Sequence, residues 1–546
     1  MKINLRPLTS LIKVFLDEAP AAFGGATIAE GFQNEVLSFQ VAYCAEDATN
    51  EASCFADLKV ESPILSCLRA RRVINVPVGL AAFPDADEHY LRYTPGLYPD
   101  LLQDVETSRI RVYLNQWHAL WFDIAPGATL APGEYPVHIT LSDTTITVTV
   151  RILSGLLPKQ TLRHTKWFHC DCLANYYNEP VWTERFWGIV ENFITAAVKQ
   201  GINMILTPIH TPPLDTGIGG ERLTTQLVDI SLENGRYTFC FKKLRRFVEL
   251  CRRAGVEYYE MAHLFTQWGA YYTPKIMAKV EGVEQRIFGW DVSAASETYR
   301  AFLSAYLPAL TKELHALGIA DKTYFHISDE PSQAQLESYA AAKALAAPYL
   351  KGFQIIDALS DIAFYNKGLV EKPIPANNHI DPFIAADIKG LWTYYCLGQY
   401  KDVSNMFMAM PSYRNRILGV QLYKYNIEGF LQWGYNFYNA QYSAYAVNPF
   451  LSTDADGFTP SGDAFQVYPG AGGIPLESLR MMVTSQALYD LRALKWLESL
   501  TDKAYVLSLI EEGLSSPVTF SSYPHSDEYL LALRTKINHE IQNRIC

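Results

Sequence analysis

The chain has 546 residues, more than a single hydrophobic core usually holds, so two or three domains are expected. Its 49% hydrophobic and 19% charged residues are typical of a chain that folds throughout. The net charge is −11, with no basic stripe and no apolar run of bilayer length, so neither nucleic acid nor a membrane is an expected partner.

The first residues do not have the pattern of a secretory leader. The segment from Met1 to Leu16 is interrupted by Lys13, and no small-residue cleavage site follows an uninterrupted apolar run. The nine cysteines are scattered without the spacing of a zinc or redox motif. We therefore expect reduced thiols, a cytoplasmic location and no metal or organic cofactor. Oligomeric state is left open.

Residues 1–158 are predicted to form a β-sandwich domain. Val137, Ile139 and Leu141 alternate with polar residues, Ser142-Asp143 turns the chain, and residues 146–152 alternate again. Alternation with a period of two on both sides of a short polar turn indicates a hairpin with one buried face. Leu157-Pro158-Lys159 is the predicted exit from this domain.

Residues 159–500 are predicted to form a (β/α)8 barrel of the TIM type, because eight strand candidates alternate with helical segments. The predicted strands are 164–172, 202–209, 256–265, 322–328, 353–358, 372–376, 390–396 and 429–435. The predicted helices are 184–200, 242–254, 297–317, 361–369, 381–388, 413–425 and 477–497, with a further helix after Ser332, whose capping box includes Gln335. Asn234-Gly235 predicts an inserted hairpin. Residues 501–546 are expected to be a short helical extension.

The most informative segment is the predicted fourth strand, which ends in Asp329 and Glu330. Unpaired carboxylates are costly to bury, so two of them at the end of an apolar strand indicate either a solvated loop or a catalytic pair. In a barrel, catalytic groups cluster where strands end, which favours the second interpretation. Both side chains can face one site only if the chain turns here. We expect Pro331 to hold Glu330 extended before the next helix.

The segment His326-Ile327-Ser328-Asp329-Glu330-Pro331 resembles the catalytic strand of glycoside hydrolase family 123, the N-acetyl-β-galactosaminidases. Further segments match in order, and the likeness covers roughly residues 160 to 500. The other matching segments are Trp167-Phe168-His169-Cys170-Asp171-Cys172, Leu391-Trp392-Thr393-Tyr394-Tyr395, Gly429-Phe430-Leu431-Gln432-Trp433-Gly434, and the stretch 462–470 followed by Ser478-Leu479-Arg480.

The resemblance implies an exo-acting glycosidase that releases terminal β-linked N-acetylgalactosamine from a glycan or oligosaccharide. It also implies a substrate-assisted retaining mechanism, in which the 2-acetamido oxygen of the sugar attacks the anomeric carbon. Glu330 would be the general acid and then the base, which requires a raised pKa. Asp329 would accept the acetamido N–H and orient the amide.

Nine further residues are candidate substrate ligands, each with a structural alternative. Aromatic residues on the late strands would line the sugar pocket or pack inside the barrel, and Asn436 would bind a hydroxyl or cap a turn. The remaining polar candidates would bind sugar or form buried hydrogen bonds. The nine are His169, Asp171, Asn203, His263, Trp392, Tyr394, Trp433, Tyr435 and Asn436.

Two other functions stay open at this point. One is a related glycosidase acting on another hexosamine or an unacetylated sugar, with Asp171, Glu260 or Asp357 as the nucleophile. The other is a non-catalytic carbohydrate-binding protein that keeps the barrel.

Overall fold

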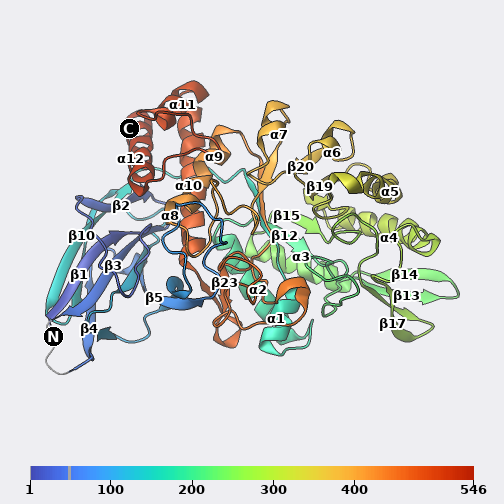
Figure 1. Cartoon of the computed structure of the whole chain (residues 1–546), viewed down its shortest axis with the longest axis horizontal. Helices are drawn as coiled ribbons and strands as arrows, with labels where there is room; N and C mark the ends of the chain where they lie inside the picture. The colour runs from blue at the N-terminus through green and yellow to red at the C-terminus, as the bar shows by residue number, and fades with distance from the viewer. Residues whose placement is uncertain (1, 47–50, 546) are drawn as a thin grey trace.

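The computed structural model describes residues 2–46 and 51–545 of the chain. Two five-stranded sheets form the N-terminal part, drawn from dark blue to cyan in Figure 1. Fully buried Phe39 and Phe122 of the first sheet and Val137, Ile139 and Val150 of the second belong to one hydrophobic cluster. In order across the sheets, the strands are β1 (Lys2–Thr9), β3 (Leu37–Glu46), β8 (His118–Ile124), β5 (Leu68–Val78) and β6 (Gly96–Asp104), then β2 (Thr27–Phe32), β10 (Thr144–Leu153), β9 (Gly133–Leu141), β4 (Ser53–Glu61) and β7 (Arg109–Tyr113).

The predicted hairpin in this region is β9 and β10. Leu141 pairs with Thr144 across the two-residue turn, and Ser142 adopts a positive φ of 56°. Val137, Ile139, Val148 and Val150 point into the cluster, so the alternation of apolar and polar residues identified the buried face correctly.

Eight parallel strands form a nearly closed barrel after this region. β22 pairs with β11, and an isolated bridge between Ala376 and Tyr394 joins the last gap, between β20 and β21. Each strand overlaps one of the eight predicted ranges. The strands are β11 (Arg163–Lys166), β12 (Met204–Thr207), β15 (Tyr258–Met261), β18 (Thr323–Phe325), β19 (Gln354–Ala358), β20 (Lys372–Ile374), β21 (Trp392–Tyr394) and β22 (Gly429–Gln432).

Helices lie between these strands, but they differ greatly in length. The helix α3 (Lys242–Ala254) ends where predicted, just before Gly255, whose φ of 98° suits a residue without a side chain. The helices after β19 and β20 are only four and five residues long, so the alternation of strand and helix is irregular there. The helices are α1 (Cys170–Tyr177), α2 (Glu184–Lys199), α3 (Lys242–Ala254), α4 (Glu297–Ala316), α5 (Leu336–Ala346), α6 (Ala363–Asn366), α7 (Asp381–Ala385), α8 (Ser412–Arg416) and α9 (Leu418–Lys424).

The loops after β12 and β15 build a small extra sheet. The hairpin predicted at Asn234-Gly235 is β13 (Asp229–Glu233) and β14 (Arg236–Cys240). A second hairpin, β16 (Ile276–Val280) and β17 (Val283–Phe288), was not predicted and joins it through β13. A further pair, β23 (Val467–Pro469) and β24 (Pro475–Glu477), lies near the end of the barrel region.

The last helices are α10 (Leu479–Leu500), α11 (Lys503–Glu511) and α12 (Asp527–Ile545). In Figure 1, α10 runs between the N-terminal sheets and the barrel, and α11 and α12 lie above the sheets. Leu479 and Val483 of α10 share a hydrophobic cluster with Leu8 and Trp121 of the N-terminal sheets. Buried Arg480 pairs with Asp100 of β6 at 2.8 Å. None of the helices within the described ranges is long and apolar enough to cross a bilayer.

Candidate active site

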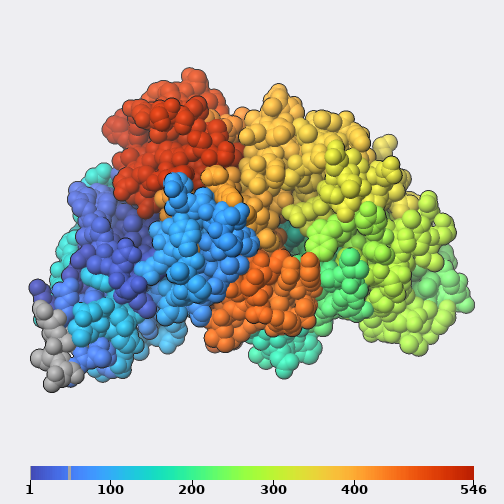
Figure 2. Space-filling model, viewed as in Figure 1, coloured from blue at the N-terminus to red at the C-terminus, as the bar shows by residue number. Residues whose placement is uncertain are grey.

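One pocket lies at the end of the barrel where the strands finish. Its volume is about 610 Å³, including the part open to solvent, and Asp329 and Glu330 both line it. The face shown in Figure 2 is hollowed where the green, yellow and orange segments meet. The remaining lining residues come from the ends of several strands and from the loops that follow them: Trp167, Leu214, Asp215, Gln267, Trp268, Ala358, Tyr394, Cys396, Leu397, Leu431, Trp433 and Phe458.

The backbone turns sharply at the carboxylate pair. Glu330 adopts a φ of 43°, in the left-handed region that is costly for a residue with a side chain. Its N–H donates to the carbonyl of Ala358 at 3.0 Å, and the carbonyl of Asp329 accepts from the N–H of Trp268 at 3.0 Å. The expectation that Pro331 holds Glu330 extended is therefore wrong. The left-handed turn, held by the end of β19 and by the loop of Trp268, is what lets adjacent carboxylates face one pocket.

Gln335 connects the segment just after Glu330 with the loop of Trp268 through its side-chain amide. Its Oε1 accepts from the N–H of Ser332 at 2.8 Å, and its Nε2 donates to the carbonyl of Trp268 at 2.7 Å. The capping residue predicted from sequence therefore also fixes the loop that holds Asp329.

Burial dominates the electrostatics of the pair. Burial raises the pKa of Glu330, and the hydroxyl of Tyr394, which donates to its Oε1, partly opposes that rise. Burial and the neighbouring Glu330 raise the pKa of Asp329 well above its ordinary value. Oδ1 of Asp329 is buried and has no hydrogen-bond partner among residues 2–46 and 51–545. Two adjacent buried carboxyls thus retain protons to a higher pH than isolated ones would.

Aromatic side chains form much of the pocket wall, and their polar ends are bonded to buried acids. Nε1 of Trp433 donates to Oδ2 of Asp463 at 2.8 Å, and Nε1 of Trp167 donates to Oε1 of Glu260 at 2.8 Å. Burial raises the pKa of Asp463 to about 7. Trp433 and Tyr394 are thus the two predicted aromatic ligands that line the pocket.

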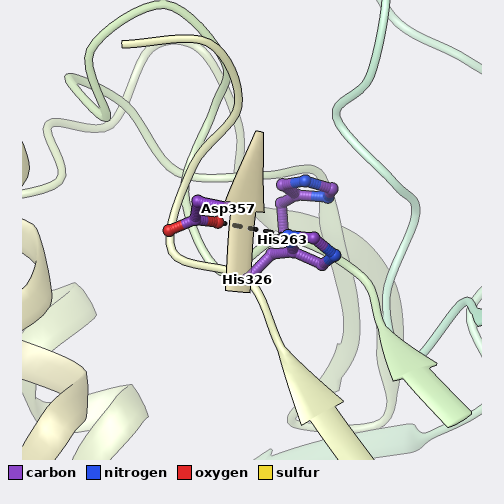
Figure 3. Close-up of side chains that lie close together, drawn as sticks. All are labelled: His263, His326 and Asp357. Atoms are coloured by element: carbon purple, nitrogen blue, oxygen red, sulfur yellow. Dashed lines mark hydrogen bonds and ion pairs between the residues drawn. The ribbon is translucent and has the colours of Figure 1, made fainter. Parts of the chain in front are cut away.

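Three buried residues near Asp329 and Glu330, namely His263, His326 and Asp357, have potential metal-ligand atoms within 4.8 Å of one another (Figure 3). However, both nitrogens of His326 are already hydrogen-bonded, Nδ1 to Asp357 at 3.1 Å and Nε2 to Glu260 at 2.6 Å. Burial would lower the pKa of His326, but these two bonds raise it to about 9. Both ring nitrogens of His326 are thus engaged by carboxylates, and His326, Asp357 and Glu260 belong to one buried hydrogen-bond network.

His263, predicted as a sugar ligand, lies inside the barrel and does not line the pocket. Its ring stacks on His326 with centroids 4.1 Å apart. Burial lowers the pKa of His263 well below its ordinary value, and the neighbouring His326 adds to the effect. His263 is therefore a neutral ring packed against a charged one.

His169 and Asp171 do not line the pocket either. The first barrel strand ends at Lys166, and Asp171 lies in α1, so the two residues do not share a strand face as predicted. Asp171 forms a buried ion pair with Arg222 at 2.6 Å, and Nδ1 of His169 lies 3.1 Å from the same guanidinium group. This geometry fits the structural alternative, in which the two residues form buried hydrogen bonds, better than it fits sugar binding.

Four more predicted ligands lie outside the pocket. Asn203 bonds the backbone of Leu162 and His164 at the start of the strands, the opposite end of the barrel. Asn436 bonds both the N–H and the carbonyl of His169, as a structural amide. The other two are Trp392, which is fully buried in the barrel interior, and Tyr435, whose hydroxyl donates to the carbonyl of Phe193.

Sequence reasoning missed several lining residues, notably Asp215, Gln267 and Trp268. They lie in long loops, where no periodicity marks which side chains turn inward. Trp167 belongs to the matched first segment but was not singled out as a ligand. The only sequence signal for the others was their position shortly after predicted strands.

Comparison with known proteins gives the same family that the sequence segments resemble. The family model described as glycoside hydrolase 123, catalytic domain, matches residues 167–497. A solved family 123 glycoside hydrolase from Clostridium perfringens, described for glycolipid glycan hydrolysis, is similar with a TM-score of 0.75 at 15% identity, covering 99% of this chain and 98% of that one.

A putative alpha-galactosidase from Bacteroides fragilis aligns with a TM-score of only 0.24 at 10% identity, covering 97% of this chain and 79% of that one, and supports no argument. No curated protein sequence matches significantly.

Proposed function

The chain belongs to glycoside hydrolase family 123, and we propose that it releases a terminal β-linked N-acetylgalactosamine from the end of a glycan. The family's catalytic model spans more than half of the chain, and the chain is accordingly a glycoside hydrolase. The proposed mechanism retains the anomeric configuration and uses the 2-acetamido group of the substrate as the nucleophile.

The observation that carries this proposal is Oδ1 of Asp329 in the pocket wall, which has no hydrogen-bond partner within the described part of the chain. A buried acceptor without a donor is costly, and the N–H of an acetamido group would supply that donor. Donation of this hydrogen bond favours the ionised form of Asp329. Because the adjacent carboxyls disfavour a second charge, the proton then stays on Glu330.

Glu330 would act first as an acid and then as a base. In the first step its proton moves to the glycosidic oxygen as the bond to C1 breaks, while the acetamido oxygen bonds to C1 and forms an oxazolinium ring. Asp329 stabilises the positive charge that develops on the amide nitrogen. In the second step the carboxylate of Glu330 takes a proton from water, which attacks C1 and reopens the ring.

The three residues weighed as protein nucleophiles are paired elsewhere and do not line the pocket. Asp171 is bonded to Arg222, Glu260 to Thr165, Trp167 and His326, and Asp357 to His326 and Tyr339. A carboxylate that already accepts several bonds in a closed environment is a poor nucleophile. This geometry supports assistance by the substrate.

The proposal is tested with aryl β-glycosides of N-acetylgalactosamine, N-acetylglucosamine and galactose, with and without the corresponding thiazoline. We expect turnover of the acetamido sugars, fastest for the galacto form, and inhibition by the thiazoline. Equal turnover of the plain galactoside would reject substrate assistance. Tight sugar binding without turnover of any glycoside would favour the carbohydrate-binding alternative. A glycolipid glycan is a natural candidate to assay next, by likeness to the Clostridium perfringens enzyme.

A further inference from the structure

Two polar side chains that the proposed mechanism does not use also face the catalytic pocket. Asp215 follows β12 and Gln267 follows β15, and both line the cavity that holds Asp329 and Glu330. Oδ2 of Asp215 and Nε2 of Gln267 are buried, and neither has a hydrogen-bond partner in the described part of the chain. Buried polar groups in folded proteins are almost always paired, so these two atoms indicate a ligand.

The backbone holds Asp215 in a fixed and strained position. Its N–H donates to Oε1 of Gln267 at 2.6 Å, and its carbonyl accepts from Oγ of Ser443 at 2.7 Å. Its φ of 40° lies in the left-handed region, which is unfavourable for a residue with a side chain. Strain of this kind persists where surrounding contacts enforce it, commonly at functional sites.

The same contact determines which end of the Gln267 amide is free. Because Oε1 accepts from a backbone N–H, Nε2 with its two hydrogens is the end without a partner. Gln267 is only 4% exposed, so bulk water does not satisfy this group. Two residues in contact therefore offer the pocket one acceptor and one donor, which is the complement of a hydroxyl group.

We propose that Asp215 and Gln267 bind a hydroxyl group on C3, C4 or C6 of the terminal sugar. The hydroxyl donates to Oδ2 of Asp215 and accepts from Nε2 of Gln267. This inference rests on the proposed function, which assigns the groups on C1 and C2 to Glu330 and Asp329 and leaves these three hydroxyls. The pair then determines specificity, because a site built to bond a hydroxyl strongly rejects an analogue without it.

The test measures each protein variant on the parent aryl glycoside and on three analogues that lack the hydroxyl on C3, C4 or C6. Asp215→Ala is expected to lower kcat/KM for the parent aryl glycoside by about 10- to 100-fold, as for a lost hydrogen bond to a charged group. For the one deoxy sugar that lacks the bound hydroxyl, the same substitution should cost less than about threefold, because the contact is already absent. Gln267→Leu should likewise lower kcat/KM least on that same deoxy sugar. Asp57→Ala, at an exposed position of β4, is the control and should behave like the wild type on every sugar.

Equal losses on the parent and on all three deoxy sugars would overturn the proposal, since that pattern indicates a structural role. If Asp215 were instead a nucleophile, activity would vanish on every sugar and a 2-deoxy-2-fluoro glycoside would label its carboxylate in the wild type. Failure of the proposed function can be distinguished from failure of this inference. If the wild type prefers galactosides, the proposed function fails, but the same comparison can be made with deoxygalactosides. Dissociation constants of the product sugar and its deoxy forms provide a readout that needs no turnover.

Discussion

The hydroxyl of Tyr394 donates a hydrogen bond of 2.5 Å to Oε1 of Glu330. Tyr394 ends β21, whereas Glu330 follows β18, so this bond joins the ends of two barrel strands across the pocket. A hydrogen bond to a carboxylate favours its ionised form, so Tyr394 limits how far burial raises the pKa of Glu330.

Tyr394→Phe should therefore raise the pKa of Glu330 further. The protonated acid would persist to higher pH, and the basic limb of the kcat/KM profile should move upward by about one pH unit, as expected for loss of roughly 1.4 kcal/mol. Tyr395→Phe is the matched control, because that buried hydroxyl has no partner in the described ranges and lies outside the pocket lining. An unchanged basic limb in Tyr394→Phe would show that this bond does not tune the acid.

Glu330→Gln removes the proposed acid without changing the side-chain length. We expect kcat/KM to fall by about 100- to 10,000-fold for glycosides with a poor leaving group, the usual contribution of general acid catalysis. The loss should be much smaller for a dinitrophenyl leaving group, which departs without protonation. Steady-state rates across a series of aryl leaving groups provide the measurement. A loss that is the same for all leaving groups would contradict the acid role.

Asp171→Asn tests whether this residue belongs to the fold or to sugar binding. Removing one partner of the buried pair with Arg222 should cost about 3–5 kcal/mol of unfolding free energy, since an uncompensated charge stays buried. Asp387→Asn, which breaks the highly exposed pair with Lys389, should cost at most about 1 kcal/mol. Denaturant unfolding compares the two. A raised KM in Asp171→Asn with unchanged stability would restore the sugar-ligand interpretation.

Asp463→Asn should stabilise the protein at high pH but not at low pH. Burial raises the pKa of Asp463 from 3.8 to about 7, so the folded state favours the protonated form. The stability that this group contributes is present below pH 4 and is lost as pH rises through 7. Asparagine stays neutral, so its advantage over aspartate in melting temperature should be larger at pH 8.5 than at pH 5. If Asp463→Asn differed from the wild type in melting temperature by the same amount at both pH values, the raised pKa of Asp463 would be contradicted.

The sequence predicted the strands better than the side chains that reach the site. Periodicity located all eight barrel strands, because burial on both faces leaves a clear apolar signal. Periodicity could not show how far along the barrel axis each inward-facing side chain lies. Trp392 and Tyr394 share a face of β21, yet Trp392 lies in the barrel interior and only Tyr394 reaches the pocket.

The errors in the site come from strand ends and loops. His169 and Asp171 were misplaced because the strand ends at Lys166 and a helix begins four residues later, within an apolar segment that continues across the boundary. Asp215 was missed because its inward position depends on contacts with Gln267 and Ser443, which are distant in sequence. Tertiary contacts of this kind leave no local pattern.

The central claim, that Asp329 positions an acetamido nucleophile supplied by the substrate, is tested most directly by varying that group. Aryl glycosides carrying acetyl, fluoroacetyl, difluoroacetyl and trifluoroacetyl amides have the same sugar and leaving group but progressively less nucleophilic carbonyl oxygens. We predict that kcat/KM falls with each added fluorine and that Asp329→Asn weakens this dependence. A rate that is insensitive to fluorination would contradict the account, because the attacking oxygen would then belong to the protein.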